Sequence, residues 1–225
     1  MFKNLLQFWR GKDFLNQVLD EFKNMLDDTH RMFDSVCRRL INNEKEGELK
    51  DNIYSLDKKV NNLEKDIRKR IIEHLAIQPS VDLPTSLLLM SVVKDAERLG
   101  DYAKNLFEVT NILNGPLDKE SYLSFFGGVG QDLEKLFDIT EEAFIESDEK
   151  KAAQAWSYET KIVEICESAI LKLANSDLPV NTAVAFTLIA RYFKRTAAHL
   201  TNIATSVIVP LDQLDYFREK RKKVI

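Results

Sequence analysis

The sequence contains few of the residues that end secondary-structure elements, with 7 glycines and 5 prolines among 225 residues. A fold with many short strands needs frequent turns, so this scarcity argues against β sandwiches and barrels. Cysteine is also rare: Cys37 and Cys166 lie far apart and belong to no CxxC pair. We therefore expect neither a disulfide framework nor a zinc site built on cysteine.

Long apolar runs and an excess of positive charge are missing as well. No apolar run reaches the roughly 18 to 20 residues needed to cross a bilayer. Residues 1–10 lack the apolar region and the small-residue cleavage site of a secretory signal, so we expect a cytoplasmic protein. The formal net charge of −4 argues against nucleic acid as a partner, since nucleic-acid binding usually needs a basic face.

What the chain does have is apolar residues at spacings of three and four, the period of an α-helix. This pattern predicts an all-α protein with six long helices. Pro84 suits the first turn of the third helix, where Asp82 is expected to accept hydrogen bonds from free amides. The glycines between 127 and 130 are expected to disturb the fourth helix. The predicted helices span approximately residues 14–42, 49–77, 84–113, 121–146, 148–174 and 180–209.

The second half of the chain repeats features of the first. Arg98 and Asn105 correspond to Arg195 and Asn202, and the members of each pair are 97 positions apart. The simplest architecture is a duplicated three-helix unit, that is, two tandem three-helix bundles. We expect Asn105 and Asn202 each to bond a neighbouring helix. The predicted domains are an amphipathic segment 1–12, a first bundle 13–115, a second bundle 116–212 and a basic tail 213–225.

The two ends of the chain are locally basic, although the whole chain is acidic. Segment 1–12 places Phe2, Leu5, Leu6, Phe8 and Trp9 among basic residues. Its aromatic residues either cap the bundle, which is the simpler interpretation, or lie on a membrane surface or a partner. The basic tail is a solvated end or a second site of peripheral contact with anionic lipid.

An acidic pair lies within the third predicted helix. Glu97 and Asp101 are four residues apart, which places their carboxylates on one face of a helix, one turn from each other. Like charges at this spacing repel. Either both side chains point to water, with Lys94 and Arg98 as local partners, or they share a cation or a basic partner.

The residues around this pair resemble a known family. Residues 97–105 read Glu-Arg-Leu-Gly-Asp-Tyr-Ala-Lys-Asn, similar to the Glu-Arg-Ile-Gly-Asp signature of the PhoU proteins, which regulate phosphate uptake. Residues 57–64, with Gln78-Pro79 after them, resemble the second helix of that family. The resemblance covers nearly the whole chain. It implies the PhoU-like fold of two tandem three-helix bundles.

The resemblance also implies that acidic motifs on the second and third helices of each bundle gather metal ions. Carboxylate oxygens from two adjacent helices suit Mg, Mn, Fe or Zn. Carried over residue by residue, the first bundle keeps Asp57, Glu97 and Asp101, and has Asn61 where many relatives place a second acid. We rank Glu64 and Asp95 lower, because on a straight helix neither is clearly on the same face.

The second bundle departs from this pattern. Lys194 and Ala198 stand 97 residues after the two acids of the third helix, so those ligands are lost. We therefore expect divalent or iron-type metal ions in the first bundle only, held by Asp57, Asn61, Glu97 and Asp101. His199 is expected to be a packed or hydrogen-bonded residue and not a ligand.

Enzymatic catalysis has little support in the sequence, which shows no nucleophile with a neighbouring base and no phosphate-binding glycine loop. The resemblance implies a regulatory adaptor that restrains phosphate transport or phosphate-responsive signalling. Its expected partners are phosphate transporter components and a membrane sensor kinase, and a homo-oligomer is expected. Two alternatives stay open: a metal-binding bundle with a storage or catalytic use, and an accessory regulator of another membrane transporter.

Overall fold

The computed structural model describes residues 13–42, 49–78, 82–113 and 115–214, and every regular element within these ranges is helical. The predicted all-α class is confirmed. Segment 1–12 and residues 215–225 of the predicted tail lie outside the described residues. The helices are α2 (Asp13–Asn42), α3 (Leu49–Ile77), α4 (Leu83–Val109), α5 (Lys119–Phe126), α6 (Val129–Glu146), α7 (Glu149–Leu173), α8 (Val180–Thr205) and the 3-10 helix η1 (Leu211–Gln213).

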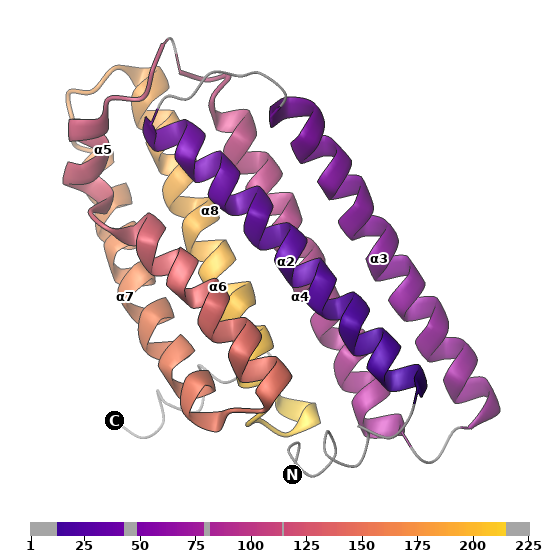
Figure 1. Ribbon diagram of the computed structural model, residues 1–225. Helices are drawn as coiled ribbons and strands as arrows, with labels where there is room; N and C mark the ends of the chain where they lie inside the picture. The colour runs from indigo at the N-terminus through magenta and orange to yellow at the C-terminus, as the bar shows by residue number, and fades with distance from the viewer. Residues whose placement is uncertain (1–12, 43–48, 79–81, 114, 215–225) are drawn as a thin grey trace.

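The long helices run side by side in an elongated bundle (Figure 1). Helices α2, α3 and α4 pack on one another, and so do α6, α7 and α8. The two groups meet where α4 packs on α8 and α2 packs on α6. Helices α3 and α7 therefore lie at opposite edges, while α4 and α8 lie in the middle (Figure 1).

Apolar side chains at helical spacing form one core that crosses both groups. Phe22 and Phe33 of α2 are fully buried. The ring of Phe22 lies 4.8 Å from that of Phe144 on α6, and the ring of Phe33 lies 6.0 Å from that of Phe193 on α8. Burying one such side chain contributes about 1.5–3 kcal/mol to folding stability. These contacts therefore stabilise the packing between the two halves as well as the packing within each half.

Gly100 of α4 faces both α2 and α3. A Cβ at this position of α4 would lie 3.5 Å from Val60 Cγ1 on α3 and 3.6 Å from Thr29 Cγ2 on α2. Both distances are ordinary van der Waals contacts. The backbone of α4 therefore lies so close to α2 and α3 that a side chain longer than a methyl group has no room at this position. The same close packing brings the acidic residues around Gly100 near α3.

The predicted fourth helix is divided into α5 and α6. Gly127 ends α5 with φ 52° and ψ −125°, a conformation that favours glycine. Its amide still donates to Leu123 O at 2.9 Å, which completes the last turn of α5. The described residues thus contain seven α-helices where six were predicted, because the glycines redirect the chain as well as disturb it.

Some helix ends differ from prediction. Helix α4 ends at Val109 and not at Leu113, and two further differences involve single side chains. Asp82 precedes α4, but its carboxylate makes no capping bond and instead lies 2.8 Å from His74 Nε2. The expectation that Asp82 caps the free amides is therefore wrong. Helix α8 ends at Thr205 and not near Val209, and the Thr205 and Ser206 hydroxyls donate to carbonyl oxygens of its last turn.

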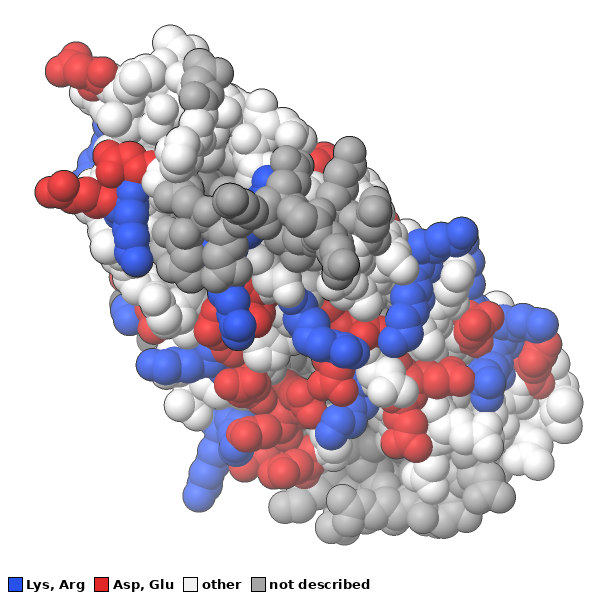
Figure 2. All heavy atoms as spheres, turned by 45° about the horizontal axis from the view of Figure 1, so that its top comes forward, with Lys and Arg blue, Asp and Glu red and all other residues white. Residues whose placement is uncertain are grey.

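The surface carries charges of both signs. On the face in Figure 2, acidic and basic side chains are interspersed, and neither sign covers that face alone. Among the described residues, no helix is both long enough and apolar enough to cross a membrane.

Candidate functional site

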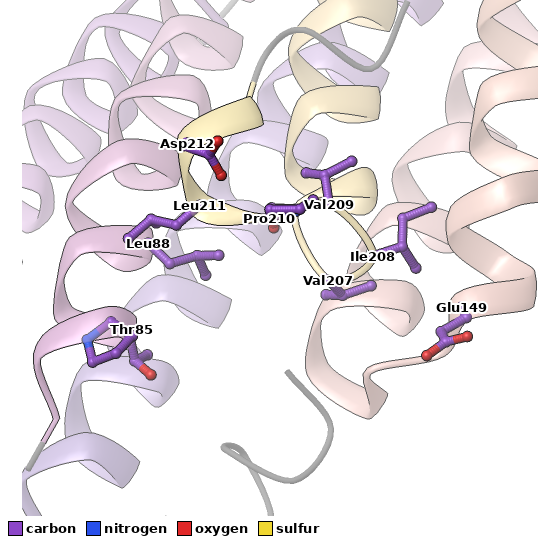
Figure 3. A pocket seen from close by; sticks show the side chains of 11 residues that line it. Thr85, Leu88, Glu149, Val207, Ile208, Val209, Pro210, Leu211 and Asp212 are labelled. Atoms are coloured by element: carbon purple, nitrogen blue, oxygen red, sulfur yellow. The ribbon is translucent and has the colours of Figure 1, made fainter. Parts of the chain in front are cut away.

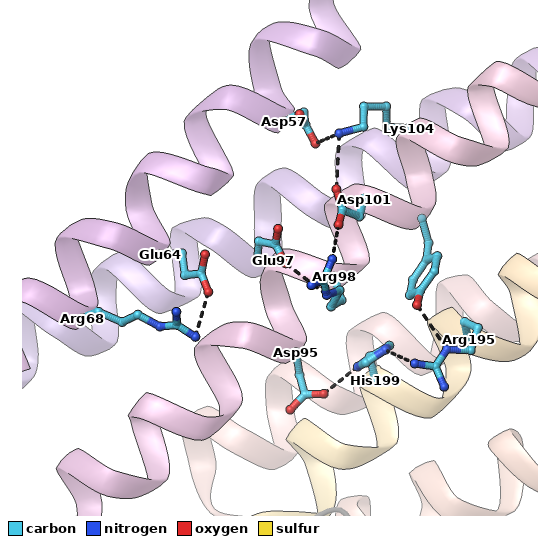
Figure 4. Close-up of polar contacts among 11 residues, drawn as sticks. Asp57, Glu64, Arg68, Asp95, Glu97, Arg98, Asp101, Lys104, Arg195 and His199 are labelled. Carbon is cyan, nitrogen blue, oxygen red and sulfur yellow. Dashed lines mark hydrogen bonds and ion pairs between the residues drawn. The ribbon is translucent and has the colours of Figure 1, made fainter.

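The acidic residues singled out by the sequence meet on one face between α3 and α4 (Figure 4). Glu97 and Asp101 lie one turn apart on α4, and Asp57 faces them from α3. The exposed fractions of these side chains are 15% for Glu97, 24% for Asp101 and 13% for Asp57. The group is therefore only partly open to water, which strengthens the repulsion among its charges.

Lys104 of α4 lies between the carboxylates of Asp57 and Asp101. Lys104 Nζ lies 2.9 Å from Asp57 Oδ1 on α3 and 3.3 Å from Asp101 Oδ1 on α4. Lys104 is thus shared by Asp57 and Asp101, whereas the basic residue that contacts both Glu97 and Asp101 is the local partner Arg98. Burial lowers the pKa of Lys104, but the hydrogen bonds and attraction from Asp57 and Asp101 outweigh it and raise that pKa above its usual value.

An arginine compensates the charge on the other side of Asp101. Arg98 Nη1 donates to Asp101 Oδ2 at 2.6 Å, and Arg98 Nε lies 3.6 Å from Glu97 Oε2. Even so, burial, followed by the repulsion from Asp101, raises the pKa of Glu97 above its usual value. The attraction of Arg98 therefore does not fully offset the burial of Glu97 and its repulsion from Asp101.

Two more polar residues of α3 line this face. Asn61 is half-buried one turn after Asp57. Glu64 is held by Arg68 at 2.9 Å, yet its charge is near enough to contribute to the raised pKa of Glu97. Helix packing thus brings the charge of Glu64 toward α4. Lys104 was missed, although its spacing of three from Asp101 was a readable signal.

In the described part of the chain, no group of three or more His, Cys, Asp or Glu side chains is arranged to hold a metal ion. The acids around Glu97 are already engaged by Lys104 and Arg98. We use the name α3–α4 acidic site for the five neighbouring side chains of Asp57, Asn61, Glu97, Asp101 and Lys104.

The corresponding place in the second half has different chemistry. Lys194 of α8 forms an ion pair with Glu167 of α7, and Ala198 has no polar side chain. A cation therefore finds no pair of acids from α8 at this position. The two halves share a fold but not this site.

A second polar group joins the two halves between α4 and α8 (Figure 4). His199 Nδ1 lies 2.6 Å from Asp95 Oδ1, and Asn202 Nδ2 donates to the same oxygen at 3.3 Å. Arg195 Nε donates to the Tyr102 hydroxyl at 3.1 Å. The predictions that His199 is hydrogen-bonded and that Asn202 bonds a neighbouring helix are confirmed.

This arrangement gives Arg195 and Asn202, which have counterparts in the first half, a structural role between α4 and α8. Asp95 is buried and has two partners on α8, so its carboxylate is hydrogen-bonded across the junction between the halves. Arg195 also approaches the ring of Tyr102, with 5.9 Å from Cζ to the ring centre. The junction is therefore polar as well as apolar, which fixes the register of α4 against α8.

Comparison with known proteins gives a consistent result. The family described as "PhoU domain" matches residues 22–110 and again residues 128–207. A protein of Clostridium acetobutylicum named "Phosphate-specific transport system accessory protein PhoU homolog" is 22% identical over 163 residues, which cover 69% of this chain and 74% of that protein.

Two solved structures share the fold. PhoU from Pseudomonas aeruginosa matches with a TM-score of 0.74 and 20% identity, covering 87% of this chain and 95% of that one. The phosphate transport system regulatory protein PhoU from Streptococcus pneumoniae matches with a TM-score of 0.74 and 18% identity, covering 90% of this chain and 95% of that one. The predicted resemblance and the PhoU-like fold are thereby confirmed.

Proposed function

The chain belongs to the PhoU family, and from this premise we propose that it regulates phosphate transport through contacts with other proteins and not by catalysis. The observation that carries the proposal is that the PhoU domain matches both halves of the chain, residues 22–110 and 128–207. Each half contains a three-helix group of the bundle. The names of the relatives from C. acetobutylicum and S. pneumoniae support phosphate as the solute concerned.

The proposed partners are components of a phosphate transporter and a membrane sensor kinase. The long exposed faces of α3 and α7, at the two edges of the bundle, leave room for a partner on either side (Figure 1). Contact with the transporter restrains uptake, and contact with the kinase couples uptake to signalling. We place the protein in the cytoplasm, in contact with the membrane through its partners, and as a homo-oligomer.

The α3–α4 acidic site fits a divalent cation in its donor chemistry. Two carboxylates from different helices, Asp57 and Asp101, already share one cation, the Lys104 ammonium, at hydrogen-bond distance. We propose that Asp57, Asn61, Glu97 and Asp101 hold a metal ion when Lys104 moves aside. Such an ion supplies charge neutralisation and links α3 to α4, and Lys104 is its internal competitor.

Deletion of the gene in its host tests the function. We expect phosphate uptake to be less restrained and phosphate-starvation genes to be misregulated, and the intact gene to restore both. Uptake of an unrelated solute, such as an amino acid, serves as the control. Unchanged phosphate uptake and unchanged starvation signalling, together with altered uptake of another solute, would overturn the proposal in favour of an accessory regulator of a different transporter.

A further inference from the structure

One end of the bundle contains an apolar pocket of about 490 Å³ (Figure 3). It lies between the start of α4, the start of α7 and the chain that follows α8. Leu88 lines it from α4, and residues 207–211 line it from the segment leading into η1. Two acids, Glu149 and Asp212, also belong to its lining.

Apolar side chains at the pocket and beside it in the sequence are exposed. Leu83 and Leu87 of α4 are 42% and 43% exposed, and Leu211 at the pocket itself is 38% exposed. Exposed apolar groups that surround a concave surface mark a place where another segment binds. An apolar segment is the kind of occupant that matches this lining.

We propose that residues 1–12 of the same chain dock in this pocket. Phe2, Leu5, Leu6 and Trp9 follow the spacing i, i+3, i+4, i+7, which is typical of the apolar face of a helix. A pocket of this volume lies within the range that buries most of a small organic ligand, so it has room for an aromatic side chain and a leucine.

The start of the described chain lies close to the pocket. The ring of Phe14 stacks on that of His74 at 4.2 Å between centres, and His74 Nε2 lies 2.8 Å from Asp82 Oδ2. Asp82 is followed two residues later by Pro84, which lines the pocket. A segment of 12 residues spans up to about 40 Å when extended and about 18 Å when helical, so residues 1–12 reach the pocket without rearrangement of α2.

The charges of the segment and the pocket are complementary. Segment 1–12 carries Lys3, Arg10 and Lys12 and no acidic residue, whereas the ionisable side chains of the pocket are those of Glu149 and Asp212. The attraction orients the segment as its apolar face enters. Because the segment is tethered, its effective concentration is on the order of millimolar, and a weak individual affinity is enough to keep it bound.

Fluorescence of Trp9 tests the docking in the full-length protein. The chain has two tryptophans, so the background variant Trp156→Phe leaves Trp9 as the only reporter. We expect blue-shifted emission that is poorly quenched by iodide, and we expect Leu211→Lys to shift it to that of a water-exposed indole. Leu123→Lys is the matched control, since Leu123 is 45% exposed on α5 at the other end of the bundle. Water-like emission before any pocket substitution would overturn the proposal.

Cross-linking identifies the occupant independently of fluorescence. The pair Leu6→Cys and Asp212→Cys is oxidised mildly, with Leu6→Cys and Leu123→Cys as the control pair. Cys37 and Cys166 are buried and do not compete. An intramolecular disulfide whose yield is independent of protein concentration, and exceeds that of the control pair, supports docking within one chain. A disulfide-linked dimer whose yield depends on protein concentration means that a second copy occupies the pocket. An intramolecular yield no higher than that of the control pair means that another occupant, such as residues 215–225, fills it. Either result overturns the proposal.

Discussion

The imidazole of His199 on α8 contacts the carboxylate of Asp95 on α4, with 2.6 Å between Nδ1 and Oδ1. This contact joins residues 104 positions apart and lies where the two halves of the chain meet. Asp95 and the side chain of His199 are both largely buried, so neither group has much water to replace a lost partner. The relative position of α4 and α8 therefore depends on a polar contact as well as on the apolar core.

Removal of Asp95 is expected to weaken this junction. Asp95→Ala leaves donors of His199 and Asn202 without their acceptor, and we expect the free energy of unfolding to fall by about 1–3 kcal/mol. Asp95→Asn keeps an acceptor oxygen and is expected to cost less. Urea denaturation checks this. Asp138→Ala is the control, since Asp138 is 68% exposed and an exposed pair contributes at most about 1 kcal/mol; equal losses for Asp95→Ala and Asp138→Ala would contradict the assigned role.

The competition between Lys104 and a metal ion gives a second prediction. Lys104→Gln removes the ammonium that Asp57 and Asp101 share, so we expect the affinity for Mn²⁺ to increase by about tenfold, which corresponds to about 1.4 kcal/mol. Asp101→Asn should lower it. Isothermal titration and elemental analysis measure both effects. Lys58→Gln, at an exposed position of α3, controls for the change in net charge; the same affinity in all these variants and in the wild type would argue against a metal at the α3–α4 acidic site.

Glu97 gives a pH-dependent prediction. Its pKa is raised in the folded protein, chiefly by burial and then by Asp101, so folding disfavours its charged form. The folded state then binds more protons than the unfolded state at pH values just above the ordinary glutamate pKa, and the contribution of Glu97 to stability falls as the pH rises through that window. We expect Glu97→Gln to stabilise the protein at pH 7 and to lose this advantage at pH values below the ordinary pKa.

Unfolding free energies of wild type and Glu97→Gln, measured between acid and neutral pH, check this expectation. Glu73→Gln is the matched control, because Glu73 is 61% exposed on α3. A wild type that is more stable than Glu97→Gln at pH 7 would mean that the Arg98 ion pair outweighs burial at this position.

The helices could be predicted from the sequence because each buries one stripe of apolar residues with a period close to 3.6. The predicted bounds of α3 match the observed Leu49–Ile77. Ends set by a single side chain were less predictable. Asp82 has the right type and place for a cap, but the competing partner His74 lies on another helix, and nothing local in the sequence indicates that contact.

The candidate site could be predicted only in part. The spacing of Glu97 and Asp101 places them on one face, and the family resemblance pairs them with Asp57. That Lys104 lies between Asp57 and Asp101 depends on how closely α4 approaches α3 at Gly100. The contact between Asp95 and His199 depends on how the two halves pack, which no local pattern encodes.

Substitutions of Gly100 distinguish the effect of side-chain size from the effect of helix propensity. A Cβ at this position meets Val60 and Thr29 at 3.5 and 3.6 Å, so alanine fits. Because alanine is the better helix former by about 1 kcal/mol, we expect Gly100→Ala to leave the melting temperature unchanged or raise it. Gly100→Leu has to push α3 and α2 apart and is expected to cost about 1–3 kcal/mol. Calorimetry distinguishes the two, and a comparable loss in both variants would contradict the packing described for Gly100.

The break between α5 and α6 tests backbone strain without steric contact. Gly127 has φ 52° and ψ −125°, and a Cβ added there would have no neighbour within 4 Å, whereas Gly128 has φ −94° and a Cβ there would meet its nearest neighbour at 3.6 Å. Neither glycine is crowded, so any difference between their alanine variants comes from the backbone. We expect Gly127→Ala to cost about 1–3 kcal/mol in unfolding free energy and Gly128→Ala to be close to neutral. If urea denaturation gave equal values for both, the division of the fourth predicted helix would not depend on the conformation of Gly127, and the glycines would act only by weakening helix propensity.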